Sequence, residues 1–118
     1  MTLIEPQVLH RDDRYTVWHA GVVHGPAGTI ILNLEIDSPE ERRFRDDPAW
    51  QSGGAPPIEA YIQLPGMAGP VAGSFSLRRE RFSFHFQERF LPVGSEQLPG
   101  ARLHIKIHPL DLHLIIDL

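Results

Sequence analysis

Apolar and polar residues alternate along most of this chain, and glycine and proline interrupt the alternation at short intervals. A period of two places successive side chains on opposite faces of an extended backbone, which is typical of β-strands with one buried face. Short connections favour antiparallel hairpins, because parallel strands need long crossovers. The sequence therefore predicts an α+β fold, a mainly antiparallel sheet of seven to eight short strands in hairpins or a meander, with one short helix near residues 39–47.

The clearest predicted hairpin joins residues 15–24 to residues 29–37 through the loop Gly25-Pro26-Ala27-Gly28. A register that continues directly from this loop places Val23 and His19 on one almost wholly apolar face, while the opposite face is mixed. Because His19 would then lie among apolar side chains, we expect a packed, hydrogen-bonded histidine there rather than a catalytic one.

A second hairpin is predicted from residues 71–77 and 82–87, which flank Arg78-Arg79-Glu80-Arg81. A four-residue loop would pair Leu77 with Phe82 and keep the apolar faces of the two strands matched. A helix is the alternative for the second segment, because phenylalanine recurs there every four residues. The alternation of aromatic residues and the lack of alanine favour a strand.

The last unit, residues 102–118, alternates on both sides of His108-Pro109-Leu110-Asp111. Those four residues suit a type I turn, and a hairpin around them pairs Ile107 with Leu112 so that every apolar residue falls on one face. A single long strand bent at Pro109 is the alternative.

Two further strands are predicted, and the weaker of them is the one at the N-terminus. Residues 58–64 alternate, and residues 2–9 form a strand that Pro6 confines to an edge. The last five residues, Leu114 to Leu118, are mostly apolar, so we expect their strand to be internal to the sheet or covered by a second subunit. A homodimer through an edge strand follows as an expectation.

The helix is predicted to begin at Ser38-Pro39-Glu40-Glu41, which reads as a capping box with proline at the first helical position. Pro48 stops it, so the helix spans residues 39–46. Phe44 is its only large apolar residue, so a narrow contact with the sheet and a mostly solvated helix are expected.

Composition excludes several classes of function. With 118 residues the chain fits one domain, residues 1–118, and without cysteine it has no disulfide framework, thiol nucleophile or thiolate zinc site. A net charge of −4 argues against sequence-specific nucleic-acid binding. No apolar run nears the ~18 residues of a membrane span, and no leader opens the sequence, so we expect a cytoplasmic protein without membrane contact. Ten arginines against one lysine fit a GC-rich bacterial genome.

Nucleophilic catalysis has little support in the sequence. Ser74, in Gly73-Ser74-Phe75, lacks the GxSxG glycine pattern of a nucleophile elbow, and Ser83 and His85 share a strand face without forming a triad. We therefore predict no catalytic residue and no cofactor, and a small non-catalytic interaction or ligand-binding module.

Arg78, Arg79 and Arg81 crowd the predicted hairpin tip, and Trp50 lies in a loop of small residues and prolines. Arginine and tryptophan are enriched at binding hot spots, and loops carry recognition more often than cores do. These four residues are the predicted contact surface for an unidentified protein or a small anionic ligand. A solvated tip and a Trp50 packed over Phe44 are the alternatives.

The alternative function is a metal-binding protein or a metal-dependent enzyme that uses a divalent transition metal. His104, His108 and His113 share the polar face of the last hairpin, at ~7–8 Å between backbones on the diagonals, so two imidazoles could reach one ion. Lys106 directly opposite His113 opposes this, because it places a cation in the middle of the site.

Overall fold

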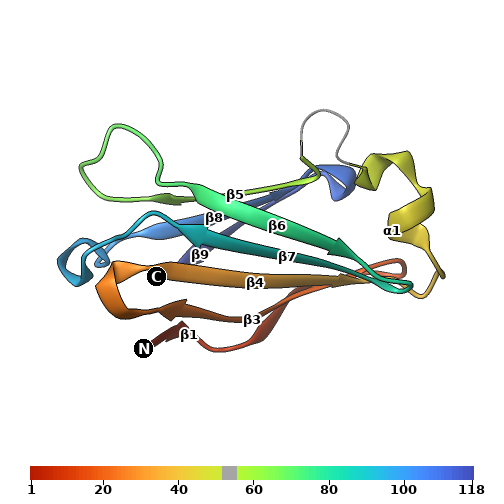
Figure 1. Ribbon diagram of the computed structural model, residues 1–118, viewed down its shortest axis with the longest axis horizontal. Helices are drawn as coiled ribbons and strands as arrows, with labels where there is room; N and C mark the ends of the chain where they lie inside the picture. Colours follow the sequence, from red (N-terminus) through yellow and green to blue (C-terminus); the bar gives the residue numbers. More distant parts are fainter. Residues whose placement is uncertain (52–55) are drawn as a thin grey trace.

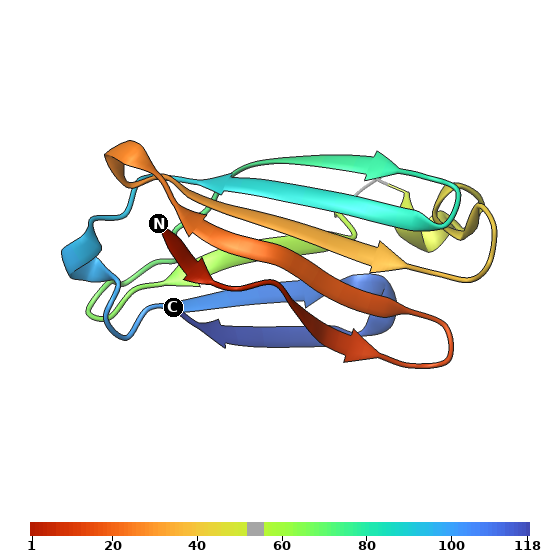
Figure 2. The ribbon, with the colours of Figure 1, turned by 90° about the horizontal axis from the view of Figure 1, so that it is seen from below.

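The structure is a computed structural model that describes residues 1–51 and 56–118. In these residues, nine strands form two antiparallel sheets stacked face to face, with one short helix at one end (Figures 1 and 2). The mainly antiparallel fold predicted from the alternation is confirmed. One strand more than expected is present because residues 2–9 divide at Pro6, as proline cannot donate a ladder hydrogen bond.

The larger sheet has six strands in the order β1-β3-β4-β7-β6, with β2 also paired to β3. The smaller sheet has three strands in the order β5-β8-β9. The bounds in the larger sheet are β1 Thr2–Ile4, β2 Gln7–Arg11, β3 Thr16–His24, β4 Ile30–Asp37, β6 Gly73–Arg79 and β7 Ser83–Phe90; in the smaller sheet they are β5 Ile58–Gln63, β8 Arg102–Ile107 and β9 Leu112–Asp117.

The hydrophobic core lies between the two sheets, where alternate residues of each strand point inward. Phe44, on the short helix, and Trp50, shortly after it, belong to the core at the end where the helix lies. The fully buried members include Val17, Ile30, Leu32, Ile36, Phe44, Trp50, Ile62, Phe84, Leu103, Ile105 and Ile107.

The β3–β4 hairpin contains a bulge that the sequence did not predict. The expected register holds up to His19, which pairs with Leu34, but beyond it Val22 rather than Gly21 lies opposite Leu32. Gly21 has a φ of 106°, a conformation that favours glycine, and it accommodates the extra residue in β3. Val22 is therefore fully buried and Val23 is 37% exposed, so the expectation that Val23 faces the core is wrong.

The β6–β7 hairpin confirms strands over the helix alternative, but with a different turn. Leu77 pairs with Phe86 instead of Phe82, and the tip consists of Glu80, Arg81 and Phe82. The predicted and observed registers differ by an even number of residues. Both therefore keep the phenylalanines of β7 on the inner face, so the hydrophobic alternation could not distinguish them.

The β8–β9 hairpin forms in the predicted register, with Ile107 opposite Leu112 and Lys106 opposite His113. The turn is closed by the Asp111 amide, which donates to the carbonyl of His108 over 3.1 Å.

The helix α1 covers only Arg43–Asp46. Arg42 has a φ of 60°, which prevents a helix from running through it, and the Ser38 hydroxyl accepts from the Glu40 amide over 3.2 Å in a local turn. The expected capping box with Glu41 is therefore wrong. Phe44 is fully buried, so the short helix is held by one core side chain.

Candidate functional site

Trp50 belongs to the interior of the protein. It lies in a single 3-10 turn, Pro48–Trp50, and its side chain is 0% exposed. Its ring centroid lies 4.9 Å from that of Phe44 and 5.3 Å from that of Phe84, within the range of favourable aromatic contacts. The structure shows Trp50 packed against Phe44, the alternative that the sequence left open. The Trp50 side chain therefore contributes nothing to the surface.

Arg79 is a structural partner of the same turn. It stands in β6 rather than in the tip, and its Nε and Nη2 donate to the Trp50 carbonyl oxygen over 3.0 and 2.7 Å. Its guanidinium also lies 5.6 Å from the centre of the Phe84 ring. Arg79 therefore ties the loop that carries Trp50 to the edge of the large sheet.

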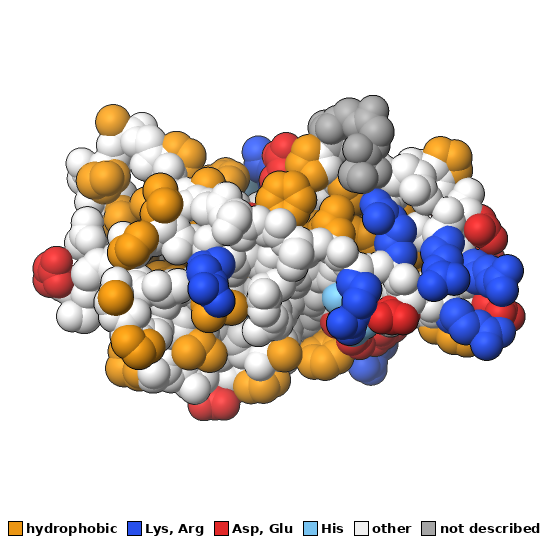
Figure 3. Space-filling model, viewed as in Figure 1, with side chains coloured by type: hydrophobic (Ala, Val, Ile, Leu, Met, Phe, Trp, Pro, Cys, Tyr) orange, Lys and Arg blue, Asp and Glu red, His pale blue; other side chains and the backbone are white. Residues whose placement is uncertain are grey.

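The other two arginines of the predicted tip are exposed and paired. Arg78 contacts Glu80 over 2.6 Å, and Arg81 pairs with Glu41. Basic side chains gather at the α1 end of the molecule, where acidic side chains lie among them (Figure 3). Since each arginine has a partner, the repulsion on which the expectation of an anionic partner rested is already relieved within the chain.

We expect Arg79→Ala to destabilise the protein by about 1–3 kcal/mol, because it removes two charge-assisted hydrogen bonds to the backbone carbonyl of the buried Trp50. Arg78→Ala and Arg81→Ala should each cost only ~0–1 kcal/mol, since exposed ion pairs contribute little. Urea denaturation followed by circular dichroism measures all three. Equal losses for the three variants would contradict this assignment.

The three histidines proposed for a metal do not converge. His104 Nδ1 and His113 Nε2 lie 2.9 Å apart, but His108 turns away and pairs with Glu59 over 3.3 Å. Burial lowers the pKa of His104, and the neighbouring His113, Arg102 and Lys106 lower it further. In the part of the chain that the structure describes, no three His, Asp or Glu side chains are grouped so as to hold a metal ion.

A hydrogen-bonded network that the sequence did not reveal crosses the outer face of the large sheet. Ser83 Oγ lies 3.1 Å from His85 Nε2, and His85 Nδ1 lies 3.1 Å from Glu35 Oε1. The Trp18 indole donates to both Glu35 and Asp37. Burial, together with the nearby Asp37 carboxylate, raises the pKa of Glu35 to about 7.

This network has the bonding order of a serine triad, but in residues 1–51 and 56–118 the strand amides beside it form no oxyanion site. An oxyanion needs free N–H donors aimed at one point. Ser83 and His85 lie on β7 and Glu35 lies on β4, and both strands are paired on each side, so their amides serve the sheet. The network therefore fixes polar side chains on the sheet face. Only the pairing of β4 with β7 brings Glu35 to His85, so spacing along the chain could not have found it.

Among the described residues, Glu88 is the only carboxyl group that is buried in the core. It lies on β7 between Phe86 and Phe90 on the inner face, and it is 3% exposed. No group among the described residues pairs with its Oε2. Burial raises the pKa of Glu88 to about 7, against a hydrogen bond from the Gly73 amide that lowers it. Burying a carboxyl group with one oxygen left without a hydrogen bond lowers the free energy of unfolding, so a role for Glu88 other than stability is indicated.

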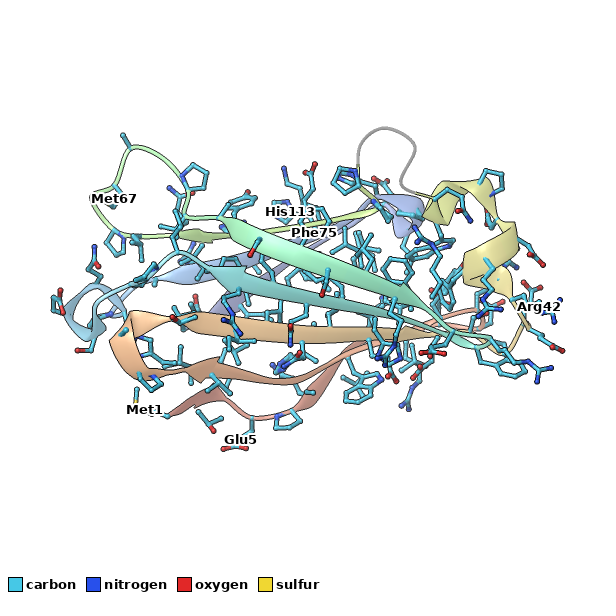
Figure 4. All side chains as sticks on the ribbon, in the orientation of Figure 1. Met1, Glu5, Arg42, Met67, Phe75 and His113 are labelled. Carbon is cyan, nitrogen blue, oxygen red and sulfur yellow. The ribbon has the colours of Figure 1, made fainter. Side chains whose placement is uncertain are left out.

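A cleft of about 310 Å³ opens beside Glu88, between the strand edges of β5 and β6. Phe75, on β6 directly opposite Glu88, is 49% exposed at this opening, and Figure 4 labels it between the ribbons of β5 and β6. Gly73 lets β6 approach β7 here, because a Cβ at this position would lie 1.9 Å from the carbonyl oxygen of Arg89. The lining residues are Pro56, Ile58, Glu59, Ala60, Tyr61, Pro70, Ala72, Gly73, Phe75 and Glu88.

One feature of the sequence marks this cleft. In residues 84–90 every second side chain is phenylalanine except Glu88, so a carboxyl interrupts an inward-facing aromatic series. A charged residue is almost never fully buried without a partner, so such an interruption indicates a functional position. The opening beside it depends on the gap between β5 and β6, which belong to different sheets, and no sequence pattern encodes that gap.

No helix among the described residues has the length and apolar character needed to cross a membrane. In comparisons with known proteins, the chain matches no family model, no curated protein and no solved structure.

Proposed function

We propose that this chain is a small non-catalytic ligand-binding module whose site is the cleft between β5 and β6, and that the ligand is a compact apolar molecule bearing an amine. The observation that carries the proposal is Glu88, a buried carboxyl with one unpaired oxygen at the wall of an otherwise mainly apolar cleft.

The size and lining of the cleft support a small ligand. A volume of about 310 Å³ lies at the lower end of the range for ligand sites, which are mostly apolar with a few placed polar groups. Proline, alanine, isoleucine and aromatic side chains supply the apolar surface, and Phe75 is left half exposed there. An apolar ligand body would cover this surface and gain about 25 cal/mol per Å² removed from water.

The charge of the lining supports an amine over an anion. Glu88 and Glu59 are the charged residues of the lining, and no lysine or arginine of the described residues belongs to it. A buried carboxylate gains most from a cation that also donates a hydrogen bond, because the surrounding dielectric is low. Because Oε2 of Glu88 is buried, the side chain has to turn toward the cleft for the ammonium of the ligand to pair with it.

We expect benzylamine to bind the chain with a Kd in the millimolar range or below, and benzoate of the same size to bind far more weakly. The affinity for benzylamine should rise as the pH increases through about 7, because only the ionised form of Glu88 attracts the ammonium. Calorimetry and chemical-shift mapping, in which the resonances of β5 and β6 should move, measure both effects.

Two variants make this experiment specific. Glu88→Gln should weaken benzylamine binding at least tenfold at pH 8. Glu35→Gln is the matched control, because the pKa of Glu35 is also raised to about 7 but the residue lies on the outer face of the sheet, away from the cleft. Equal binding of benzoate and benzylamine, or unchanged binding by Glu88→Gln, would disprove the proposal.

A further inference from the structure

Strand β9 forms an open edge of the smaller sheet. Among the described residues it pairs with β8 alone, over six residues without a register shift. Figure 2 shows it as the outermost strand of that layer. β9 contains no proline, lysine or bulge, the devices that usually protect an edge, and Ile115 at its centre is 53% exposed. This edge is therefore ready to pair with another strand.

The direction of the free backbone groups follows from one hydrogen bond. The Leu118 amide donates to the Ala101 carbonyl over 3.0 Å, so the residues at even positions of β9 direct their backbone groups toward β8. The backbone N–H and C=O of His113, Ile115 and Asp117 consequently point to the open edge. Their side chains lie together on the outer face of the sheet.

We propose that the occupant of this edge is a second copy of the same chain, whose β9 pairs antiparallel with β9 of the first about a two-fold axis at Ile115. In this register His113, Ile115 and Asp117 lie opposite Asp117, Ile115 and His113 of the second copy. The three residues whose backbone groups point to the open edge then all form hydrogen-bonded pairs. Any register displaced by two or more residues leaves at least one of them without its counterpart in β9.

The side chains in this register complement one another on both faces. Within each chain Asp117 contacts Arg102 over 3.3 Å, and His113 Nε2 lies 2.9 Å from His104 Nδ1. In the dimer His113 also lies opposite Asp117 of the second copy at two places on the outer face, so each Asp117 gains a second basic neighbour once the imidazole is protonated. The exposed Ile115 covers its own symmetry mate at the axis. On the inner face Leu114 lies opposite Ile116 of the second copy, so the apolar layer continues across the interface. The strand β9 is thus complementary to itself, which favours a second copy over an unrelated strand.

The proposal predicts a dimer, measured by sedimentation velocity from micromolar to submillimolar concentration. Ile115→Lys should convert the chain to a monomer, because two lysines would face each other at the axis and because lysine protects strand edges. Val8→Lys is the matched control, since Val8 is 50% exposed on β2, an edge of the other sheet. This variant should remain a dimer.

Disulfide cross-linking at position 115 tests the same dimer independently of sedimentation. In an antiparallel hydrogen-bonded pair the Cα atoms lie ~5.5 Å apart, within the ~4.4–6.8 Å that a disulfide spans. Because the chain has no cysteine, Ile115→Cys introduces the only thiol, and mild oxidation with oxidised glutathione should join two chains by a disulfide. Val8→Cys under the same conditions should stay monomeric on a non-reducing gel. A wild-type chain that sediments as a monomer at every concentration, or a dimer that survives Ile115→Lys, overturns the proposal.

Discussion

Replacing Trp50 with alanine is expected to lower the free energy of unfolding by about 3–5 kcal/mol, the cost of emptying a large aromatic site in a core. The Trp50 side chain is 0% exposed and contacts Phe44, Phe84 and Tyr15. It closes one end of the core, and α1 is too short to be stable without the packing of Phe44 against it. Urea denaturation followed by far-UV circular dichroism measures the loss.

The matched control for this prediction is Phe82→Ala. Phe82 is also aromatic, but it is 47% exposed at the β6–β7 turn, so its removal should cost less than about 1 kcal/mol. If Trp50→Ala does not fold, Trp50→Phe supplies a measurable smaller loss. A stability change at position 50 no larger than that at position 82 would show that the aromatic cluster is open to solvent.

Replacing Glu88 with glutamine is expected to stabilise the protein at pH 8 by about 3 kcal/mol. The pKa of Glu88 is about 7 in the folded chain against a usual value of 4.5, and each unit corresponds to about 1.4 kcal/mol. Above pH 7 the wild-type chain keeps a charged carboxylate in the core, and glutamine, of nearly the same shape, carries no charge. The variant should also lose benzylamine binding, so stability and binding change in opposite directions.

The pH dependence of this effect has a defined sign. Below pH 4.5 Glu88 is protonated in both the folded and the unfolded chain, so the two proteins should be about equally stable. Between pH 4.5 and 7 the unfolded chain releases a proton that the folded chain retains, so the wild type loses stability as the pH rises. Glu5→Gln, at an exposed position, should not change the profile. Parallel stability profiles for wild type and Glu88→Gln from pH 4 to 8 would contradict the burial of an unsatisfied carboxyl.

The arrangement of hairpins was predictable because it depends on neighbours along the chain. The β8–β9 register follows from matching apolar faces across a four-residue turn, and both determinants lie within residues 102–118. The β3–β4 register was predictable only up to His19. The bulge at Gly21 lies where the pairing of β3 passes from β2, at His19, to β1, at Val22, and the hairpin residues alone do not specify that change. The β6–β7 turn was misplaced because registers that differ by an even number of residues bury the same face.

The candidate site was predictable only in part. The position of Glu88 within an aromatic alternation marks a carboxyl on the inner face, and this information is local to β7. The sequence could not show how the arginines of the predicted tip are paired. The partners of Arg79 and Arg81 are the Trp50 carbonyl and the Glu41 carboxylate, which are distant in sequence. Trp50 looked accessible because its loop is rich in small residues, but the space at the end of the core lies between elements far apart in the chain.

By itself, the sequence determined that this chain folds into antiparallel strands with one buried face each, because alternation and turn residues act over a few positions. Only the tertiary structure decided that these strands divide into two stacked sheets, since that division depends on which hairpins bury their apolar faces against each other. The same stacking leaves β5 and β6 unpaired with each other at one side, beside Glu88, and leaves β9 open at the edge of the smaller sheet. Sheet stacking is driven by non-directional burial of apolar surface, which no local pattern in the chain specifies.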